Sequence, residues 1–256
     1  MIKKIIKYVA RLSFEKITRT NINMTTVGTK NQSNREVWLE KTLKKILTGS
    51  RILDAGAGEK KYKRFCSHLN YVAQDFAQYK GKGDGRGLQT ESWDQTKLDI
   101  VSDITAIPEP DTSFDAIMCI EVLEHLSEPI KAIQEFARLL KQGGILILTA
   151  PFCSLTHFAP YHFCTGFNRY FYEKYLPANG FKIIELQENG NFFEYLAQEI
   201  RRIPSVAERY TKGRKYTRFE SLAIKRCLSM LERFSKEDCG SNELLHFGYH
   251  IIGEKK

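Results

Sequence analysis

Apolar runs that alternate with an amphipathic helical segment constrain the fold of this chain more than any other feature. The runs lack the polar alternation of a strand with one exposed face, which predicts strands buried on both faces of a sheet. They lie at residues 51–55, 71–74, 114–120 and 145–149. Between the last two runs, residues 128–144 keep apolar side chains at helical spacing and end in Gly143 and Gly144. This order of strand, helix and strand predicts parallel strands with right-handed crossovers, and so an open, doubly wound α/β sheet.

The 256 residues divide by composition into four parts. Residues 1–33 combine a basic amphipathic helix with a polar linker, and residues 34–190 hold the predicted sheet core, which opens with a helix at 34–48. Residues 191–240 form a basic and mostly helical insertion, and residues 241–256 supply the last strand. The insertion is compatible with four roles: a lid over an acceptor, a platform for nucleic acid, a membrane contact, or a helical cap on the sheet edge.

The N-terminal stretch is neither a secretory signal nor a membrane span, because Lys7 and Arg11 interrupt its apolar residues. Two interpretations remain open for it. It can lie as a helix on an anionic bilayer, or it can dock on the domain as an accessory helix, and the second interpretation is favoured.

Charge and cysteine content bound the partners and the compartment. The formal net charge of +9 favours anionic partners, although a solvated basic surface gives the same balance. Six cysteines without a C-x-x-C pair indicate a reducing, cytoplasmic compartment, with no disulfide framework and no zinc site. Contact with the inner face of a membrane through the basic helices is compatible with this location.

The segment "ILDAGAG" places Asp54, Gly56 and Gly58 directly after the first predicted strand and ahead of a predicted helix. In a doubly wound sheet such a turn borders the ligand crevice at the carboxyl ends of the strands. A dinucleotide fingerprint requires a third glycine where this chain has Lys61. The carboxylate of Asp54 would repel a pyrophosphate, whereas it suits a cationic or zwitterionic ligand.

Asp75 ends the second predicted strand, where a carboxylate can accept hydrogen bonds from both hydroxyls of a ribose. The neighbouring Phe76 offers a flat apolar face for a purine. A site that suits an amino acid, a ribose and an adenine, but no phosphate, predicts S-adenosylmethionine as the ligand.

Residues 51–149 resemble the core of class I S-adenosylmethionine-dependent methyltransferases, in the small-molecule group with D-x-G-x-G and E-V-L-E-H motifs. Four segments match in order: "ILDAGAG", "YVAQDF", "DIVSDITAIPEPDTSFDAI" and "FDAIMCIEVLEHL". The resemblance implies that Asp103 and the backbone amide of Ile104 hold the adenine, and that Glu121 contacts the cofactor. It also implies a Rossmann-like sheet of seven mostly parallel strands, the last one antiparallel.

The segment "EVLEHL" supplies Glu121, Glu124 and His125, and a helix starting here would place Glu121 and His125 one turn apart. Two carboxylates and an imidazole suit a Mg²⁺ or Mn²⁺ ion. The pattern resembles that of ubiquinone-pathway O-methyltransferases and small-RNA 2′-O-methyltransferases, which implies a divalent metal at these residues. In the RNA-modifying enzymes a further histidine beyond the fifth strand completes the site, and this chain offers His157 and His162 there, of which His162 is the predicted ligand. In the alternative without a metal, Glu121 touches the cofactor and His125 acts as an acid or base, or only lines the pocket.

Residues 151–181 are dense in aromatic and histidine side chains and are predicted to cover the acceptor. His162 joins His125 and Glu121 as a catalytic candidate. The candidates for the acceptor pocket are His157, Tyr161, Phe163, Phe167 and Arg169.

These features favour a methyltransferase that acts on an oxygen, or less readily a nitrogen, of a small-molecule or carbohydrate-like acceptor. One alternative is metal-assisted 2′-O-methylation of RNA, which is less favoured because the basic residues are dispersed and form no recognised RNA-binding module. The other alternative is a methyltransferase-like protein that binds without catalysis.

Overall fold

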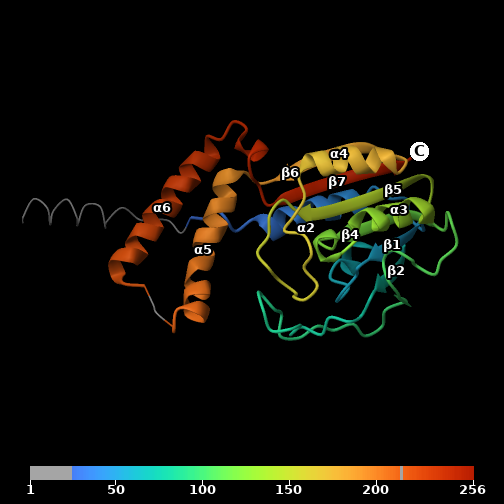
Figure 1. Ribbon diagram of the computed structural model, residues 1–256. Helices are drawn as coiled ribbons and strands as arrows, with labels where there is room; N and C mark the ends of the chain where they lie inside the picture. Colours follow the sequence, from blue (N-terminus) through green and yellow to red (C-terminus); the bar gives the residue numbers. More distant parts are fainter. Residues whose placement is uncertain (1–24, 214–215) are drawn as a thin grey trace, which may run out of the picture.

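Seven strands form one sheet in the computed structural model, which describes residues 25–213 and 216–256 (Figure 1). The spatial order of the strands is β3-β2-β1-β4-β5-β7-β6. Strands β1 to β5 pair in parallel, whereas β7 pairs antiparallel with β5 and β6. The predicted doubly wound, seven-stranded and mostly parallel sheet is therefore confirmed. The strands are β1 Arg51–Ala55, β2 Asn70–Asp75, β3 Ile100–Val101, β4 Phe114–Ile120, β5 Leu140–Pro151, β6 Phe181–Asn189 and β7 Gly248–Lys255.

Helices cover both faces of this sheet. Helix α2 (Asn31–Leu43) packs on one face, and helices α3 (Pro129–Leu139) and α4 (Arg169–Ala178) pack on the other. Strand β4 shows how one strand serves both sides: Met118 joins the α2 side and Ile117 the α3 side, and both side chains are fully buried. Burial on both faces explains why the central strands read as continuous apolar runs.

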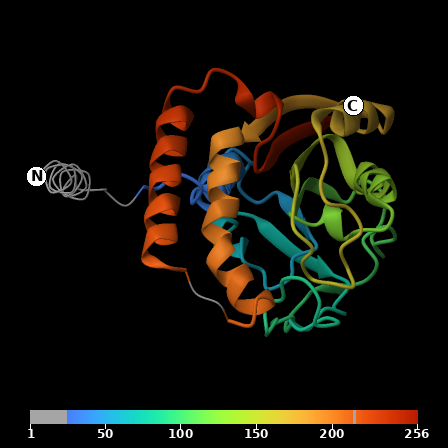
Figure 2. The same ribbon diagram turned by 60° about the vertical axis from the view of Figure 1, so that its left-hand side comes forward.

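Helices α5 (Phe192–Tyr210) and α6 (Arg218–Lys236) form an antiparallel hairpin between β6 and β7, beside the sheet (Figures 1 and 2). Its small core contains Ala197, Leu228 and Leu231 together with Val27 from the segment before α2. The predicted helical insertion before the last strand is confirmed, while its predicted roles stay predictions. The predicted N-terminal helix lies, up to residue 24, outside the described residues.

The segment after the glycine turn is not the predicted helix. Residues 57–66 form successive turns and a short 3₁₀ helix at Lys63–Phe65, in which amide groups bond to carbonyls three residues earlier. Lys60 has a φ of 57°, in the left-handed region that a right-handed helix excludes. The glycine turn therefore presents bare loop backbone to the crevice, and not the N-terminus of an α-helix.

Two helix boundaries also differ from the sequence prediction. Helix α2 spans Asn31–Leu43, whereas residues 34–48 were expected to be helical. Helix α3 ends at Leu139, because the backbone of Leu140 is already extended and pairs with Phe114 of β4. Strand pairing here overrides the helical spacing of the sequence, so that Gly143 and Gly144 belong to β5. Among the helices of the described ranges, none combines the length and apolar character needed to cross a bilayer.

Two buried histidines near the start of β7 make the fold sensitive to acid. His250 stacks on Trp38 with ring centroids 4.7 Å apart, and His246 bonds through Nδ1 to the carbonyl of Gly248. Burial lowers the pKa of each imidazole to about 4. Both rings are therefore neutral in the folded protein at pH 7, and protonation opposes folding.

We predict that the free energy of unfolding falls as the pH drops from about 6.5, the unfolded pKa of histidine, to about 4. Each ring contributes a loss of up to about 3 kcal/mol over this range, because a folded pKa below the unfolded one gives stability that is present only at higher pH. Urea unfolding at several pH values measures the loss. His250→Phe keeps the stack on Trp38 and should shrink the loss, and an undiminished loss in this variant would contradict the assignment.

Candidate functional site

The carboxyl ends of β1, β2 and β4 define the candidate site, at the point where the order of the sheet reverses. The glycine turn after β1 lines it, with Gly56 and Gly58 at φ values of 76° and 50°. A Cβ atom on Gly56 would lie 2.6 Å from a methyl carbon of Val122, and one on Gly58 would lie 2.6 Å from the ring of Trp93. Glycine is therefore needed at both positions for the backbone conformation and for close approach.

The buried carboxylate of Asp75 fastens this turn to the end of β2. Its Oδ2 accepts a hydrogen bond from the amide of Gly58 at 2.9 Å. Its Oδ1 accepts one from the amide of Ala77 at 2.9 Å and one from the side-chain amide of Gln95 at 3.0 Å. Phe76, the next residue, meets the ring of Tyr161 edge to face, with centroids 4.9 Å apart. Asp75 and Phe76 thus stand at the crevice, where the sequence predicted them.

Asp54 lies deeper than the other predicted cofactor residues. Its side chain is buried and accepts a hydrogen bond from the hydroxyl of Tyr71 at 2.5 Å. Burial raises the pKa of Asp54 to about 7, and the nearby Asp75 adds to this rise. The negative charge of Asp54 is consequently sensitive to its surroundings, and a cationic ligand nearby would favour the ionised form.

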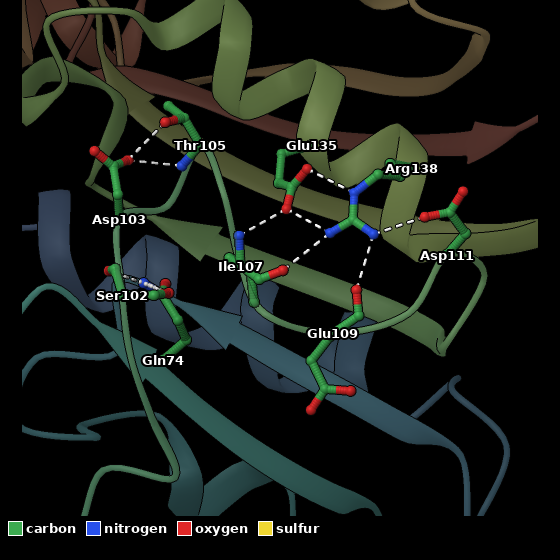
Figure 3. A network of polar contacts seen from close by, with 9 residues as sticks. All are labelled: Gln74, Ser102, Asp103, Thr105, Ile107, Glu109, Asp111, Glu135 and Arg138. Atoms are coloured by element: carbon green, nitrogen blue, oxygen red, sulfur yellow. Dashed lines mark hydrogen bonds and ion pairs between the residues drawn. The ribbon is translucent and has the colours of Figure 1, made fainter.

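Asp103 and Ile104 follow β3 on a segment that a network of polar contacts fixes in place (Figure 3). Asp103 is exposed and bonds to the amide and hydroxyl of Thr105, at 2.8 and 2.7 Å, whereas the side chain of Ile104 is buried in the core. Further along, Arg138 of α3 donates to the carbonyls of Ile107 and Glu109. Arg138 also bonds to Glu135 and Asp111, and Glu135 accepts from the amide of Ile107.

Glu121 directly follows β4 and adopts a left-handed conformation, with φ at 56°. Its carboxylate accepts from the hydroxyl of Thr149 at 2.9 Å and forms an ion pair with Arg35 of α2 at 2.7 Å. Burial works to lower the pKa of Arg35, but the charge of Glu121 together with Tyr62 and Glu124 outweighs it, so that the pKa is raised. Sequence reasoning missed Arg35, because no motif distinguishes it from the many basic residues of the chain.

The "EVLEHL" segment does not form the predicted α-helix. Only Leu123–His125 is helical, as one 3₁₀ turn, because the left-handed Glu121 interrupts a regular helix. Glu121 and His125 are therefore not stacked one turn apart, and the structure brings a different group together. The carboxylate of Glu124 lies between two imidazoles, with its Oε1 3.8 Å from Nε2 of His125 and 3.9 Å from Nε2 of His157.

The two imidazoles at Glu124 are each fixed by a backbone carbonyl. Nδ1 of His125 bonds to the carbonyl of Tyr161 at 2.6 Å, and Nδ1 of His157 bonds to that of Leu155 at 2.8 Å. In the neutral tautomers that these bonds select, both Nε2 atoms carry free electron pairs toward Glu124. Glu124 is buried, and its Oε2 has no hydrogen-bond partner among the described residues. Burial raises its pKa well above the usual value, and the charge of Glu121 adds to this rise.

Glu124, His125 and His157 could together hold a metal ion, since each offers a ligand atom and these atoms lie within 4.8 Å of one another. A buried carboxylate oxygen that still lacks a donor, beside two imidazoles that backbone carbonyls orient, has the features of a metal site. His162 lies beside the group, with its ring centroid 4.8 Å from that of His157 and its Nε2 bonded to Ser154.

The remaining predicted pocket residues separate into two sets. The chain from His157 to Phe163 stays close to His125, whose ring stacks on Phe158 at 5.1 Å. Phe163 is 55% exposed. Phe167 instead packs in the core under β5, and Arg169 pairs with Glu173 on the exposed side of α4. These last two residues therefore lie away from the crevice, and their prediction as pocket residues is not supported by their positions.

Comparison with known proteins identifies the central part of the chain. Residues 53–148 match the family model described as a methyltransferase domain. A ubiquinone biosynthesis O-methyltransferase from Xanthomonas oryzae pv. oryzae is 36% identical over 106 residues, covering 40% of this chain and 44% of the relative. A demethylmenaquinone methyltransferase from Clavibacter sepedonicus is 28% identical over 179 residues, or 67% of each chain. The match thus spans less than half of the ubiquinone relative.

A solved structure supports the fold. The crystal structure of an S-adenosylmethionine-dependent methyltransferase from Archaeoglobus fulgidus superposes with a TM-score of 0.53. The superposition covers 87% of this chain and 94% of the other, at 14% sequence identity. At this identity the likeness concerns the fold alone.

We predict that Arg35→Ala lowers the free energy of unfolding by about 3 kcal/mol, because it leaves the half-buried charge of Glu121 without its cation. Arg64→Ala is the matched control, since Arg64 forms a 2.9 Å ion pair with Glu36 but is 53% exposed. An exposed pair of this kind contributes about 1 kcal/mol or less. Urea unfolding at pH 7 measures both, and equal losses would contradict a structural role for the Arg35–Glu121 pair.

Proposed function

Because this chain belongs to the class I S-adenosylmethionine-dependent methyltransferases, we propose that it methylates an oxygen atom of a small-molecule acceptor. The observation that carries this proposal is the adjacency of two half-sites at one sheet edge. The glycine turn and Asp75 form the first, and the histidine cluster around Glu124 forms the second. The names of the two relatives support a small-molecule acceptor over a macromolecule.

The residues at the first half-site fit S-adenosylmethionine. A carboxylate at the end of β2 can accept hydrogen bonds from ribose hydroxyls. The two glycines carry no side chain that would keep a ligand from the backbone, although Val122 and Trp93 lie over them in this structure. The carboxylates of Asp54 and Asp75 suit the positive charge of a sulfonium and disfavour a phosphate. When bound, this cofactor supplies a methyl group that is already activated, so the protein mainly has to align the two reactants and exclude water.

The second half-site would receive the acceptor oxygen. His125 is held in one orientation by the carbonyl of Tyr161 and by the stack on Phe158. Burial lowers the pKa of His125 to about 3, and the neighbouring His157 adds to this effect. The imidazole is thus neutral, with the electron pair of Nε2 free to accept a hydrogen bond or to bind a metal. The aromatic side chains around it suit an acceptor with a flat apolar part.

A divalent metal fits Glu124, His125 and His157 better than the predicted set of Glu121, Glu124, His125 and His162. Arg35 and Thr149 already occupy the carboxylate of Glu121, and His162 bonds to Ser154. Two imidazoles and one carboxylate suit Mn²⁺ better than Mg²⁺, which prefers oxygen ligands. When bound, such an ion would favour the ionised form of an acceptor hydroxyl.

Isothermal titration with S-adenosylmethionine and S-adenosylhomocysteine tests the cofactor half of the proposal, and absence of binding by both would overturn it. Transfer of a labelled methyl group tests the other half, with hydroxylated aromatic compounds and saccharides assayed beside RNA. Label in the small hydroxylated compounds is the expected result. Label confined to RNA would favour the 2′-O-methylation alternative, and cofactor binding without any transfer would favour a non-catalytic role.

We predict that Asp75→Ala weakens binding of S-adenosylhomocysteine by about 10- to 100-fold, because it removes the carboxylate that accepts the ribose hydroxyls. Asp99→Ala is a matched control, since Asp99 also accepts a hydrogen bond from a backbone amide, that of Ala73 in β2, but it precedes β3 and lies away from the crevice. Titration calorimetry measures both variants. An unchanged dissociation constant for Asp75→Ala would refute its role.

We also predict that His125→Ala lowers turnover at least about 100-fold and leaves the affinity for S-adenosylhomocysteine nearly unchanged. His68→Ala serves as the control, because His68 bonds to the carbonyl of Leu43 on the α2 side of the sheet. If a metal is held, Glu124→Gln and His157→Ala should each abolish Mn²⁺ binding in calorimetry. Full Mn²⁺ binding by these two variants would contradict the assigned ligands.

A further inference from the structure

The connection between β2 and β3 crosses the candidate crevice. It runs from residue 76 to residue 99, and all of these residues are described, with a single bridge between Leu88 and His157 as their only strand-like pairing. Loops of this length inside a compact domain are uncommon and usually have a function. Its second half, which contains Trp93 and Gln95, returns to the glycine turn.

Trp93 and Gln95 lie where the proposed cofactor would bind. The ring of Trp93 covers Gly58, since a Cβ atom on that glycine would be 2.6 Å away. The side-chain amide of Gln95 donates to Oδ1 of Asp75 at 3.0 Å. Oδ1 also accepts from the amide of Ala77, so little capacity remains for a ribose hydroxyl while Gln95 is in place. Gln95 thus makes the contact that the ribose would make.

Hydrogen bonds hold the loop in place both near Trp93 and near its tip at Gly85 and Gly87. Near Trp93, the amide of Asp94 donates to Glu59 at 3.0 Å, and Nζ of Lys60 donates to the carbonyl of Lys97 at 3.2 Å. Near its tip, Arg209 at the end of α5 donates to the carbonyls of Gly87 and Gly85, at 2.6 and 3.1 Å. The two views show the same approach of the loop to the end of α5 (Figures 1 and 2).

An aromatic cluster joins the loop to the acceptor side. Tyr79 stacks on Phe158 with centroids 4.6 Å apart, and Trp93 meets both rings edge to face, at 5.7 and 5.2 Å. Phe158 also stacks on His125. The loop therefore packs on the segment predicted to cover the acceptor (residues 151–181), and this segment packs on the histidine cluster. Movement of the loop would alter the packing of both.

We propose that residues 79–97, called the lid from here on, compete with the cofactor, with Gln95 holding the place of the ribose on Asp75 and Arg209 of α5 latching the lid. The proposal rests on the proposed function, since it concerns the same cofactor site. It also gives the helical insertion a role, because the contact with α5 then sets the fraction of molecules whose crevice is open. A cofactor that binds only the open form has an apparent affinity reduced by that fraction.

Loosening the lid should therefore speed cofactor entry. In stopped-flow measurements with S-adenosylhomocysteine, we expect Gln95→Ala and Arg209→Ala to raise the association rate by up to about tenfold, as the loss of one or two hydrogen bonds allows. Arg202→Ala is the matched control, because Arg202 lies on the same helix and pairs with Glu199 instead of the lid. Its association rate should equal that of the wild-type protein.

Hydrogen exchange without cofactor gives an independent readout. Amides of residues 83–97 should exchange faster in Arg209→Ala than in Arg202→Ala, while amides of β4 stay equally protected in both. Equal exchange rates of the lid amides in the two variants would refute the proposal that Arg209 latches the lid. A lower association rate or a higher dissociation constant for S-adenosylhomocysteine in Gln95→Ala would refute the proposal that Gln95 competes with the cofactor. Such a result would make Gln95 a cofactor ligand.

These outcomes are distinguishable from failure of the proposed function. If the wild-type protein binds no cofactor, the methyltransferase proposal falls and the competition falls with it. If it binds cofactor and the lid variants associate at the wild-type rate, only the lid proposal is refuted.

Discussion

The hydrogen bond between the carboxylate of Asp75 and the amide of Gly58 is the contact on which the rest of the site depends. It joins the end of β2 to the turn after β1, which the parallel pairing of the two strands brings together. A buried carboxylate is stable only with hydrogen-bond donors around it, and here backbone amides supply two of them. The side chain of Gln95 supplies the third, and a bound ribose would offer hydroxyl donors of the same kind.

The histidine cluster around Glu124, where the acceptor is proposed to bind, differs from the cofactor half because its carboxylate lacks a full set of hydrogen-bond donors among the described residues. Its central carboxylate, Glu124, is buried with one oxygen unpaired within the described part of the chain, and its two imidazole neighbours are oriented by backbone carbonyls. Such an arrangement leaves electron pairs pointing at one another, which is unfavourable until a proton or a cation stands between them. Glu121 acts on this cluster through its charge, and its pair with Arg35 ties the end of β4 to α2.

Local patterns in the sequence predicted the sheet and the cofactor half, because each depends on a few consecutive residues. Buried strands read as apolar runs, and the glycine turn and Asp75 stand at strand ends. The sequence could not predict that Lys60 adopts a left-handed conformation, or that Leu140 pairs with Phe114 and ends α3 early. Nor could it place Arg35 on Glu121 or select His157 over His162 as the neighbour of Glu124, since these contacts join distant segments through the folded loops. The path of the lid depends on Arg209, which lies far along the chain.

A crystal structure of the protein with S-adenosylhomocysteine tests the central claim most directly. We expect both ribose hydroxyls to bond to Asp75, the adenine to lie near Phe76 and Ile104, and the side chain of Gln95 to have left the carboxylate. A crevice still filled by Gln95 and Trp93 at saturating ligand would contradict this expectation. A nucleotide bound there through its pyrophosphate would do so as well.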